Sequence, residues 1–98
     1  LKDLSKFKAE CERKDDTKRV DLILRGSLNF INLPELNKTL SNIPEAYQVH
    51  VNFNRLRYID HSCFEEIMNW QDNYELQGGK AFLELEQLEQ KLDKSIND

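Results

Sequence analysis

Four side chains in this sequence have the chemistry of zinc ligands: Cys11, His50, His61 and Cys63. Zinc sites hold their ligands at short recurring spacings such as Cys-x-x-Cys or His-x-x-x-His, and none of the four stands in such a spacing. Alternation in the flanking residues also puts His50 on the polar face of a predicted strand. We therefore expect no metal site. Two cysteines are too few for a disulfide-rich secreted fold, so we expect both to be reduced, buried thiols at apolar positions.

Motifs for enzymatic catalysis are missing as well. Gly78-Gly79-Lys80 differs from a phosphate-binding loop, because the leading glycine, the spacing and the trailing Ser or Thr are absent and a strand follows instead of a helix. No Gly-x-Ser-x-Gly nucleophile elbow occurs. We therefore predict no catalytic residue and no cofactor.

The stretch with the clearest functional potential is Asp60-His61-Ser62, which joins a predicted buried strand to the longest predicted helix. A helix N-terminus presents free backbone N–H groups and the positive end of the helix dipole, so it can bind an anion or hold a phosphorylated side chain. The alternative is structural: Asp60 or Ser62 caps the helix, and His61 is an exposed loop residue. Asn32 raises the same question at the first helix, where it is a predicted N-cap and a candidate contact for an anion or a partner.

Composition is that of a compact globular domain. The 98 residues are 39% hydrophobic and 33% charged, which suits a single domain over residues 1–98. A net charge of −4 argues against nucleic acid as a partner, since nucleic-acid binders concentrate basic residues on one face. The longest aliphatic run is three residues, as in Leu22-Ile23-Leu24, so no segment is predicted to insert into a membrane. Because the chain begins at Leu1 rather than Met, we expect it to be part of a longer protein.

Hydrophobic periodicity predicts the elements that position the Asp60 turn. Alternation predicts strands over residues 6–12, 20–25, 48–53 and 80–83. Spacings of three and four predict helices over 33–43, 62–77 and 85–96, the last ending near Ile96. The first two strands should form an antiparallel hairpin, and a strand–helix–strand crossover should make the third strand parallel to the second. Because the strands have a polar face, we predict an α/β fold with a small mixed sheet of about four strands and helices mainly on one face.

This order of elements, with an Asp at the exit of the third strand, resembles the STAS domain (anti-sigma factor antagonist-like fold) over residues 7–96. Three stretches carry the resemblance: Gly26-Ser27-Leu28-Asn29-Phe30-Ile31-Asn32, Val49–Phe53 with Leu56–Asp60, and Gly78-Gly79-Lys80. They are similar, in turn, to the Gly-x-Leu-x-Phe-x-Asn stretch, the third strand with its approach to the turn, and the turn into the fourth strand in the STAS domains of SulP-type anion transporters.

The resemblance implies a cytoplasmic regulatory domain of a SulP-type secondary transporter of sulfate, bicarbonate or a related anion. It would act on the cytoplasmic face of the membrane, and its expected partners are the transmembrane domain of the parent transporter, a second STAS domain or a cytosolic regulator. The alternative is the family's other branch, a free-standing anti-sigma factor antagonist or stressosome-type signalling protein.

One departure separates the two branches. Antagonists carry Asp-Ser-Ser-Gly or Asp-Thr-Ser-Gly, in which the residue after Asp accepts the phosphate, whereas this sequence has Asp60-His61-Ser62-Cys63. His61 occupies the acceptor position, and this favours the transporter branch; Ser62 is the remaining hydroxyl that a kinase could use. Because imidazole titrates near neutrality, His61 is also a hypothetical pH sensor.

Overall fold

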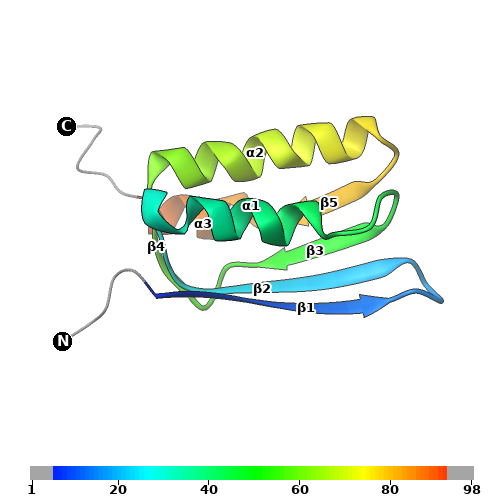
Figure 1. The fold of residues 1–98 in the computed structure, drawn as a ribbon, viewed down its shortest axis with the longest axis horizontal. Coiled ribbons are helices and arrows are strands. Elements are labelled where there is room, and N and C mark those ends of the chain that lie inside the picture. The colour runs from blue at the N-terminus through cyan, green and yellow to red at the C-terminus, as the bar shows by residue number, and fades with distance from the viewer. Residues whose placement is uncertain (1–5, 93–98) are drawn as a thin grey trace.

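The computed structural model describes residues 6–92, which form a five-stranded mixed sheet and three α-helices. In chain order the elements are β1 (Phe7–Lys14), β2 (Arg19–Leu28), the 3-10 helix η1 (Phe30–Asn32), α1 (Leu33–Ser41), β3 (Gln48–Asn52), β4 (Leu56–Ile59), α2 (His61–Leu76), β5 (Lys80–Leu83) and α3 (Leu85–Lys91). Figure 1 shows the helices together on one side of the sheet. The predicted α/β class, with its mixed sheet and one-sided helix layer, is confirmed.

The pairing of β1, β2 and β3 follows the prediction, and the sheet contains one strand more than predicted. β1 is antiparallel to β2, β3 is parallel to β2, and β5 is parallel to β3. The additional strand is β4, which the sequence indicated only as a lead-in to the Asp60 turn. It forms because β2 is ten residues long and β3 only five, so that the far half of β2 is left free to pair with β4 in parallel.

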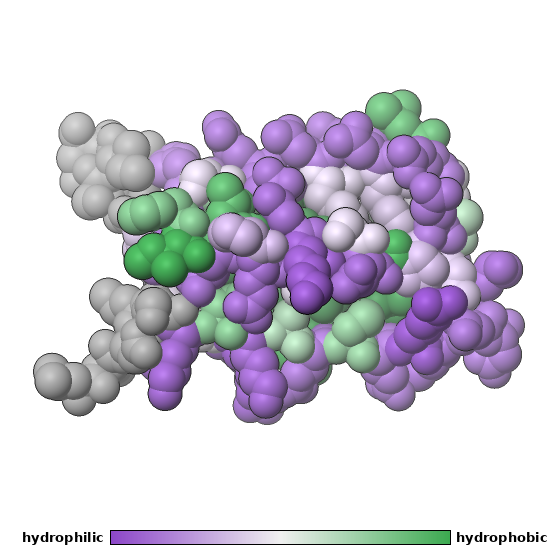
Figure 2. All heavy atoms as spheres, viewed as in Figure 1, coloured by the Kyte–Doolittle hydropathy of each residue, from purple (hydrophilic) through white to green (hydrophobic). Residues whose placement is uncertain are grey.

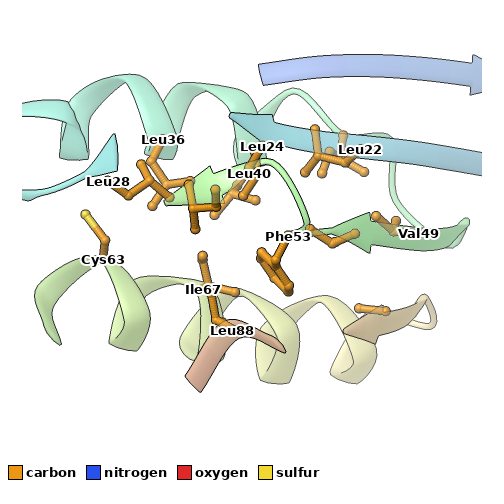
Figure 3. Packing of buried hydrophobic residues seen from close by; sticks show 14 of the residues in the cluster. Leu22, Leu24, Leu28, Leu36, Leu40, Val49, Phe53, Cys63, Ile67 and Leu88 are labelled. Carbon is orange, nitrogen blue, oxygen red and sulfur yellow. The ribbon is translucent and has the colours of Figure 1, made fainter. Parts of the chain in front are cut away.

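The core lies between the sheet and the helices. Alternate residues of β2, among them Leu22 and Leu24, are fully buried on the helix-facing side. Leu36 of α1, Ile67 of α2 and Leu88 of α3 are each buried against that side, so every helix contributes to one cluster (Figure 3). The Asp60 turn therefore connects β4, which pairs with β2, to a helix that is fixed by its own core contacts.

Two expectations about the ends of elements change. Cys11, predicted to be buried, is exposed, because it lies on the edge strand β1, whose residues from Cys11 to Lys14 are all exposed. The last helix ends at Lys91, and Ile96 lies outside the described residues. No helix among residues 6–92 has both the length and the apolar character needed to cross a bilayer.

Candidate functional site

Asp60 holds the turn between β4 and α2 in one conformation. Its backbone N–H donates to the carbonyl oxygen of Leu28 at 2.9 Å, which ties the exit of β4 to the end of β2. Its carboxylate Oδ1 accepts from the backbone N–H of Cys63 at 2.9 Å and from the Ser62 hydroxyl at 2.8 Å. Asp60 is therefore the N-cap of α2, and the alternative cap by Ser62 is wrong.

His61 and Ser62 face different surroundings. The helix begins at His61, whose side chain is half-buried, and its Nε2 atom is buried without a hydrogen-bond partner. The prediction of an exposed loop histidine is thus wrong, because His61 is taken into the first turn of α2. Ser62 is exposed. An anion at this terminus would meet the carboxylate of Asp60, which already occupies the N–H of Cys63 and repels negative charge.

Cys63 joins the turn to the segment that precedes α1. Its thiol is fully buried and donates to the carbonyl oxygen of Asn29 at 3.3 Å. Burial, with a smaller contribution from the charge of Asp60, raises the pKa of the Cys63 thiol to about 12. The expectation of a buried thiol is confirmed for Cys63, and at such a pKa the thiol is inert as a nucleophile at neutral pH.

Asn32 does not cap α1 as predicted. It precedes the helix but its side chain makes no capping hydrogen bond there, and only 7% of the residue is exposed. The capping box lies one turn earlier: the Asn29 side chain accepts from the N–H of Ile31 at 2.9 Å, and the Asn32 side chain accepts from the N–H of Asn29 at 3.4 Å. Asn32 is therefore a buried structural residue of η1, and its side chain is not on the surface where the predicted contact requires it.

Phe30 and Ile31, the most exposed apolar residues of this end, were not among the predicted site residues. Their exposed fractions are 71% and 60%, high for large apolar side chains. They lie beside the Asp60 turn because Leu28 and Asn29, immediately before them, bond to Asp60 and Cys63. Figure 2 shows hydrophobic side chains at the end of the molecule where η1 leads into α1. Two bulky apolar residues between a pair of asparagines were the available signal.

We call Phe30, Ile31, Asp60, His61 and Ser62 the junction surface. It combines a carboxylate engaged in a helix cap with an exposed apolar pair, and this chemistry suits contact with another molecule. The described residues, 6–92, contain no group of three or more His, Cys, Asp or Glu side chains placed to hold a metal ion.

Comparison with known proteins identifies the fold and goes no further. No family model and no curated protein matches the chain. The crystal structure of a protein named Mglu is similar, with a TM-score of 0.66 and 22% sequence identity over 76% of this chain and 19% of that one. The chain therefore spans about a fifth of the length of that protein, and at this identity the likeness concerns the fold alone. Membership of the STAS family stays a prediction.

Proposed function

We propose that the chain is an STAS-type regulatory domain of a SulP-type anion transporter, acting through protein contacts at the junction surface. One observation carries the proposal: beside Asp60, which is committed to capping α2, the side chains of Phe30 and Ile31 are 71% and 60% exposed. Exposed apolar groups rimmed by polar ones are typical of surfaces that bind other proteins.

The fold supports a role within a larger protein. A small α/β domain of this kind matches 19% of the longer Mglu chain, so the architecture occurs as one unit among others. The junction surface is also rigidly mounted, since backbone and thiol hydrogen bonds tie η1, β2 and the start of α2 together. Because the surface is rigid, a contact there shifts the domain as a unit and is not absorbed by local rearrangement of the turn.

Regulation would follow from a difference in affinity. If the junction surface binds one transport state more tightly than the other, it shifts their equilibrium by the ratio of the two affinities. Couplings of this kind are typically about 1–3 kcal/mol, or roughly 5–150-fold in an equilibrium constant. The domain needs no reactive group for such a role, and the transported anion would be selected in the transmembrane part.

The first test is the full coding sequence, in which a polytopic membrane region joined to this chain is expected. The second is anion uptake by the full-length protein in proteoliposomes, comparing Ser62→Arg with Gln77→Arg. Both residues are exposed and lie at opposite ends of α2, which is 16 residues or about 24 Å long. Both variants therefore place an arginine, and with it the same additional positive charge, at different places.

We expect Ser62→Arg to change the uptake rate at least about fivefold, within the usual range of such couplings, and Gln77→Arg to leave it unaltered. Equal uptake by Ser62→Arg and the parent protein would show that the junction surface does not regulate transport. A coding sequence without membrane helices would contradict the proposal that the chain belongs to a transporter. The pH-sensing hypothesis for His61 is tested in the same vesicles, where His61→Gln should flatten the pH dependence of uptake.

The exposure of Ser62 favours a second candidate, the free-standing antagonist. Its hydroxyl stands at the surface one residue beyond the acceptor position of that branch, bonded to Asp60 at 2.8 Å. Kinase treatment followed by mass spectrometry separates the candidates: stoichiometric phosphate on Ser62 favours the antagonist, and an unmodified Ser62 favours the transporter domain.

A further inference from the structure

We propose that the same end of the domain is a membrane-contact surface, which binds an anionic bilayer through a cluster of basic side chains and places Phe30 and Ile31 at the lipid interface. The cluster consists of Lys6, Lys8, Arg25 and Arg55, and we call it the basic corner. The orientation of the domain toward the bilayer, argued below, rests on the proposed function; the lipid affinity of the surface does not.

Gly26 brings the basic corner together. In the β1–β2 register Lys8 lies opposite Arg25, the N–H of Ser27 donates to the carbonyl oxygen of Lys6 at 2.9 Å, and the N–H of Gly26 donates to that of Arg55 at 3.2 Å. Gly26 has a φ of +88°, and a Cβ there would lie 2.4 Å from the carbonyl oxygen of Lys6. Only glycine permits this close approach of the residues at the start of β1 to β2. The hydrogen bond from Gly26 brings Arg55 to the same place.

Most of the charge in the basic corner remains available. Arg25 is paired with Glu10 at 2.7 Å, and this hydrogen bond, with the charges of Arg25, Lys8 and Arg55, lowers the pKa of Glu10. The other three cations form no ion pair within residues 6–92. Lys and Arg side chains near an anionic membrane each add about 1 kcal/mol of attraction, so three unpaired cations give substantial binding.

A shallow hollow of about 430 Å³ lies between the basic corner and the first turn of α1. Lys6, Lys8 and Arg25 line it together with Glu35, which belongs to the first turn of α1 directly after η1. A phosphate headgroup in the hollow would therefore meet three cations and the single carboxylate of Glu35. Phe30 and Ile31, in the turn that precedes α1, would reach the acyl boundary. Basic residues flanking exposed Phe or Leu side chains are the usual composition of surfaces that lie on a bilayer.

The apolar pair is prepared for this contact. The capping box of Asn29 and Asn32 and the hydrogen bond from the N–H of Leu33 to the carbonyl oxygen of Phe30 fix η1 in one conformation. Because the backbone of η1 is already fixed, insertion of Phe30 and Ile31 would restrict few additional rotatable bonds. The conformational entropy lost on binding would therefore be small compared with the free energy gained by burying apolar surface.

The remaining charge distinguishes the helix α2 from the basic corner. α2 carries four acidic residues and no Lys or Arg, namely Glu65, Glu66, Asp72 and Glu75. They belong to the helix layer, whereas the basic corner belongs to the strand ends and the β3–β4 turn. An anionic bilayer attracts the one and repels the other, so it orients the domain. The net charge of −4 conceals this separation.

The course of the chain agrees with that orientation. Lys6, where the described residues begin, bonds to Ser27 at this end, and Leu92, where they end, forms a bridge with Ile59 at the same end (Figure 1). Under the proposed function, a linker from a preceding membrane region reaches the domain here. It would hold the basic corner and the apolar pair close to the lipid headgroups.

The test is co-flotation of the 98-residue chain with vesicles of phosphatidylcholine, with and without phosphatidylserine. We expect binding only to the anionic vesicles. Raising the salt from about 0.1 M to about 1 M shortens the Debye length from about 10 Å to about 3 Å and should release most of the bound protein.

Two pairs of variants locate the contact. Lys6→Glu/Lys8→Glu should weaken binding at least about tenfold, whereas Lys14→Glu/Lys18→Glu, the same charge change at the far end of the β1–β2 hairpin, should bind like the parent. Phe30→Ser/Ile31→Ser should also weaken binding, whereas Leu76→Ser, at a side chain 84% exposed on the far end of α2, should not. Circular dichroism confirms that each variant is folded.

Absence of binding to anionic vesicles, or equal losses in the matched variants, would overturn the proposal; the first result would point instead to an acidic protein partner for the basic corner. These outcomes are separate from those of the transport test. If the domain regulates uptake but does not bind lipid, the proposed function is supported and the membrane-contact surface is contradicted. If the coding sequence has no upstream membrane helices but the chain still floats with anionic vesicles, the membrane-contact surface is supported and the proposed transporter function is contradicted.

Discussion

The two ends of the domain differ in how many of their charged and aromatic side chains are bonded within the domain. At the end formed by the β1–β2 turn and the loops before β3 and β5, which we call the hairpin end, polar groups bond to one another. The Tyr74 hydroxyl donates to the carbonyl oxygen of Pro44 at 2.7 Å and accepts from the N–H of Tyr47 at 2.9 Å. The Tyr47 hydroxyl in turn donates to Asp15 at 2.6 Å, and Arg13 pairs with the same carboxylate.

At the junction end, much of the same chemistry is left without a partner in the domain. The large side chains of Phe30 and Ile31 lie in solvent, Lys6 and Lys8 form no ion pair within residues 6–92, and the Nε2 atom of His61 has no hydrogen-bond partner. The difference indicates that the two ends have different roles. Groups that already bond to one another contribute to stability and have few free donors, acceptors or charges for a partner. Substitutions at the hairpin end should therefore reduce stability, and substitutions of exposed groups at the junction end should reduce binding.

The largest loss of stability is expected for Gly79→Ala at the hairpin end. A Cβ on Gly79 would lie 2.2 Å from Cε2 of Tyr74, whose ring is held by two hydrogen bonds and stacks on Trp70 at 5.1 Å. The ring cannot give way without breaking these contacts, so the free energy of unfolding should fall by about 3 kcal/mol in urea titrations. Gly78→Ala is the matched control.

Gly78 has open space around it and a φ of +98°, so an alanine there meets backbone strain alone and should cost about 1–2 kcal/mol. If the two alanine variants were equally stable, the packing around Tyr74 would not be what holds this end together.

The second largest effect should come from Tyr74→Phe, which removes the hydroxyl and keeps the ring. The N–H of Tyr47 and the carbonyl of Pro44 both lose their partner, and Tyr47 is buried. A buried donor without a partner costs about 2 kcal/mol, which thermal or urea unfolding would detect. Tyr47→Phe, which breaks only the bond to the exposed Asp15, should cost at most about 1 kcal/mol. A smaller loss for Tyr74→Phe than for Tyr47→Phe would contradict the ranking.

Asp60→Ala should have the next effect, at the junction end, where the N-cap is a structural group. Removing the cap should lower the free energy of unfolding by about 1 kcal/mol. Asp60→Asn keeps an oxygen that can accept from the N–H of Cys63 and should retain most of the stability. Equal stability of the alanine and asparagine variants would mean that the cap contributes nothing.

The helix caps show where reasoning from sequence ends. Asp60 and Ser62 both carry an oxygen at a plausible cap position, and the sequence allows either. The choice is made by β4, because the bond from the N–H of Asp60 to Leu28 fixes Asp60 as the last extended residue before α2. That bond depends on β4 pairing with the far half of β2, a contact between residues about thirty positions apart that no local pattern encodes.

The strand β5 shows the opposite case. Residues 80–83 were predicted as a strand and form one with the same bounds, because Gly78 ends the preceding helix locally with a positive φ. The paired glycines, the short apolar run after them and the turn are all neighbours in sequence. Elements defined by local chemistry were predictable, and elements defined by what lies beside them in space were not.

Phe30 and Ile31 were missed for a geometric reason. Apolar residues ahead of an amphipathic helix suggest burial, but a 3-10 turn advances about 120° per residue, so positions three apart share a side. Asn29 and Asn32 are three apart and face inward as a capping pair, and the two residues between them are turned to solvent. Local sequence did not indicate that this turn would be a 3-10 helix.

A smaller effect is expected at the hairpin end in acid. The hydrogen bond from Tyr47, followed by the one from Arg13, lowers the pKa of Asp15 below its ordinary value of 3.8. A carboxyl group with a lowered folded-state pKa stabilises the fold above its unfolded pKa, and this contribution is lost as the pH falls through the folded pKa. Asp15→Asn should therefore flatten the decline of stability below about pH 4 in unfolding curves measured at a series of pH values. An unchanged decline would show that the Tyr47–Asp15 bond does not persist in solution.

The smallest effect on stability is expected for Phe30→Ser/Ile31→Ser, a change that should nevertheless weaken binding. Both side chains are more than half exposed, so serine gives up little buried area, and surface changes of this kind usually alter the free energy of unfolding by less than about 0.5 kcal/mol. The capping box beneath them uses the Asn29 and Asn32 side chains and stays intact. Urea titrations would measure the stability and vesicle flotation the binding of the same preparation.

A loss of more than about 1 kcal/mol would mean that the apolar pair contributes to the core, and the contrast between the two ends would fail. A stable variant that no longer binds would show that two of the largest apolar side chains on the surface of this chain serve a partner and not the fold. A protein that exposes such groups without a partner gains nothing in stability and becomes prone to aggregation, so their exposure on a fixed turn is itself an argument for a surface that is covered when the domain is in use.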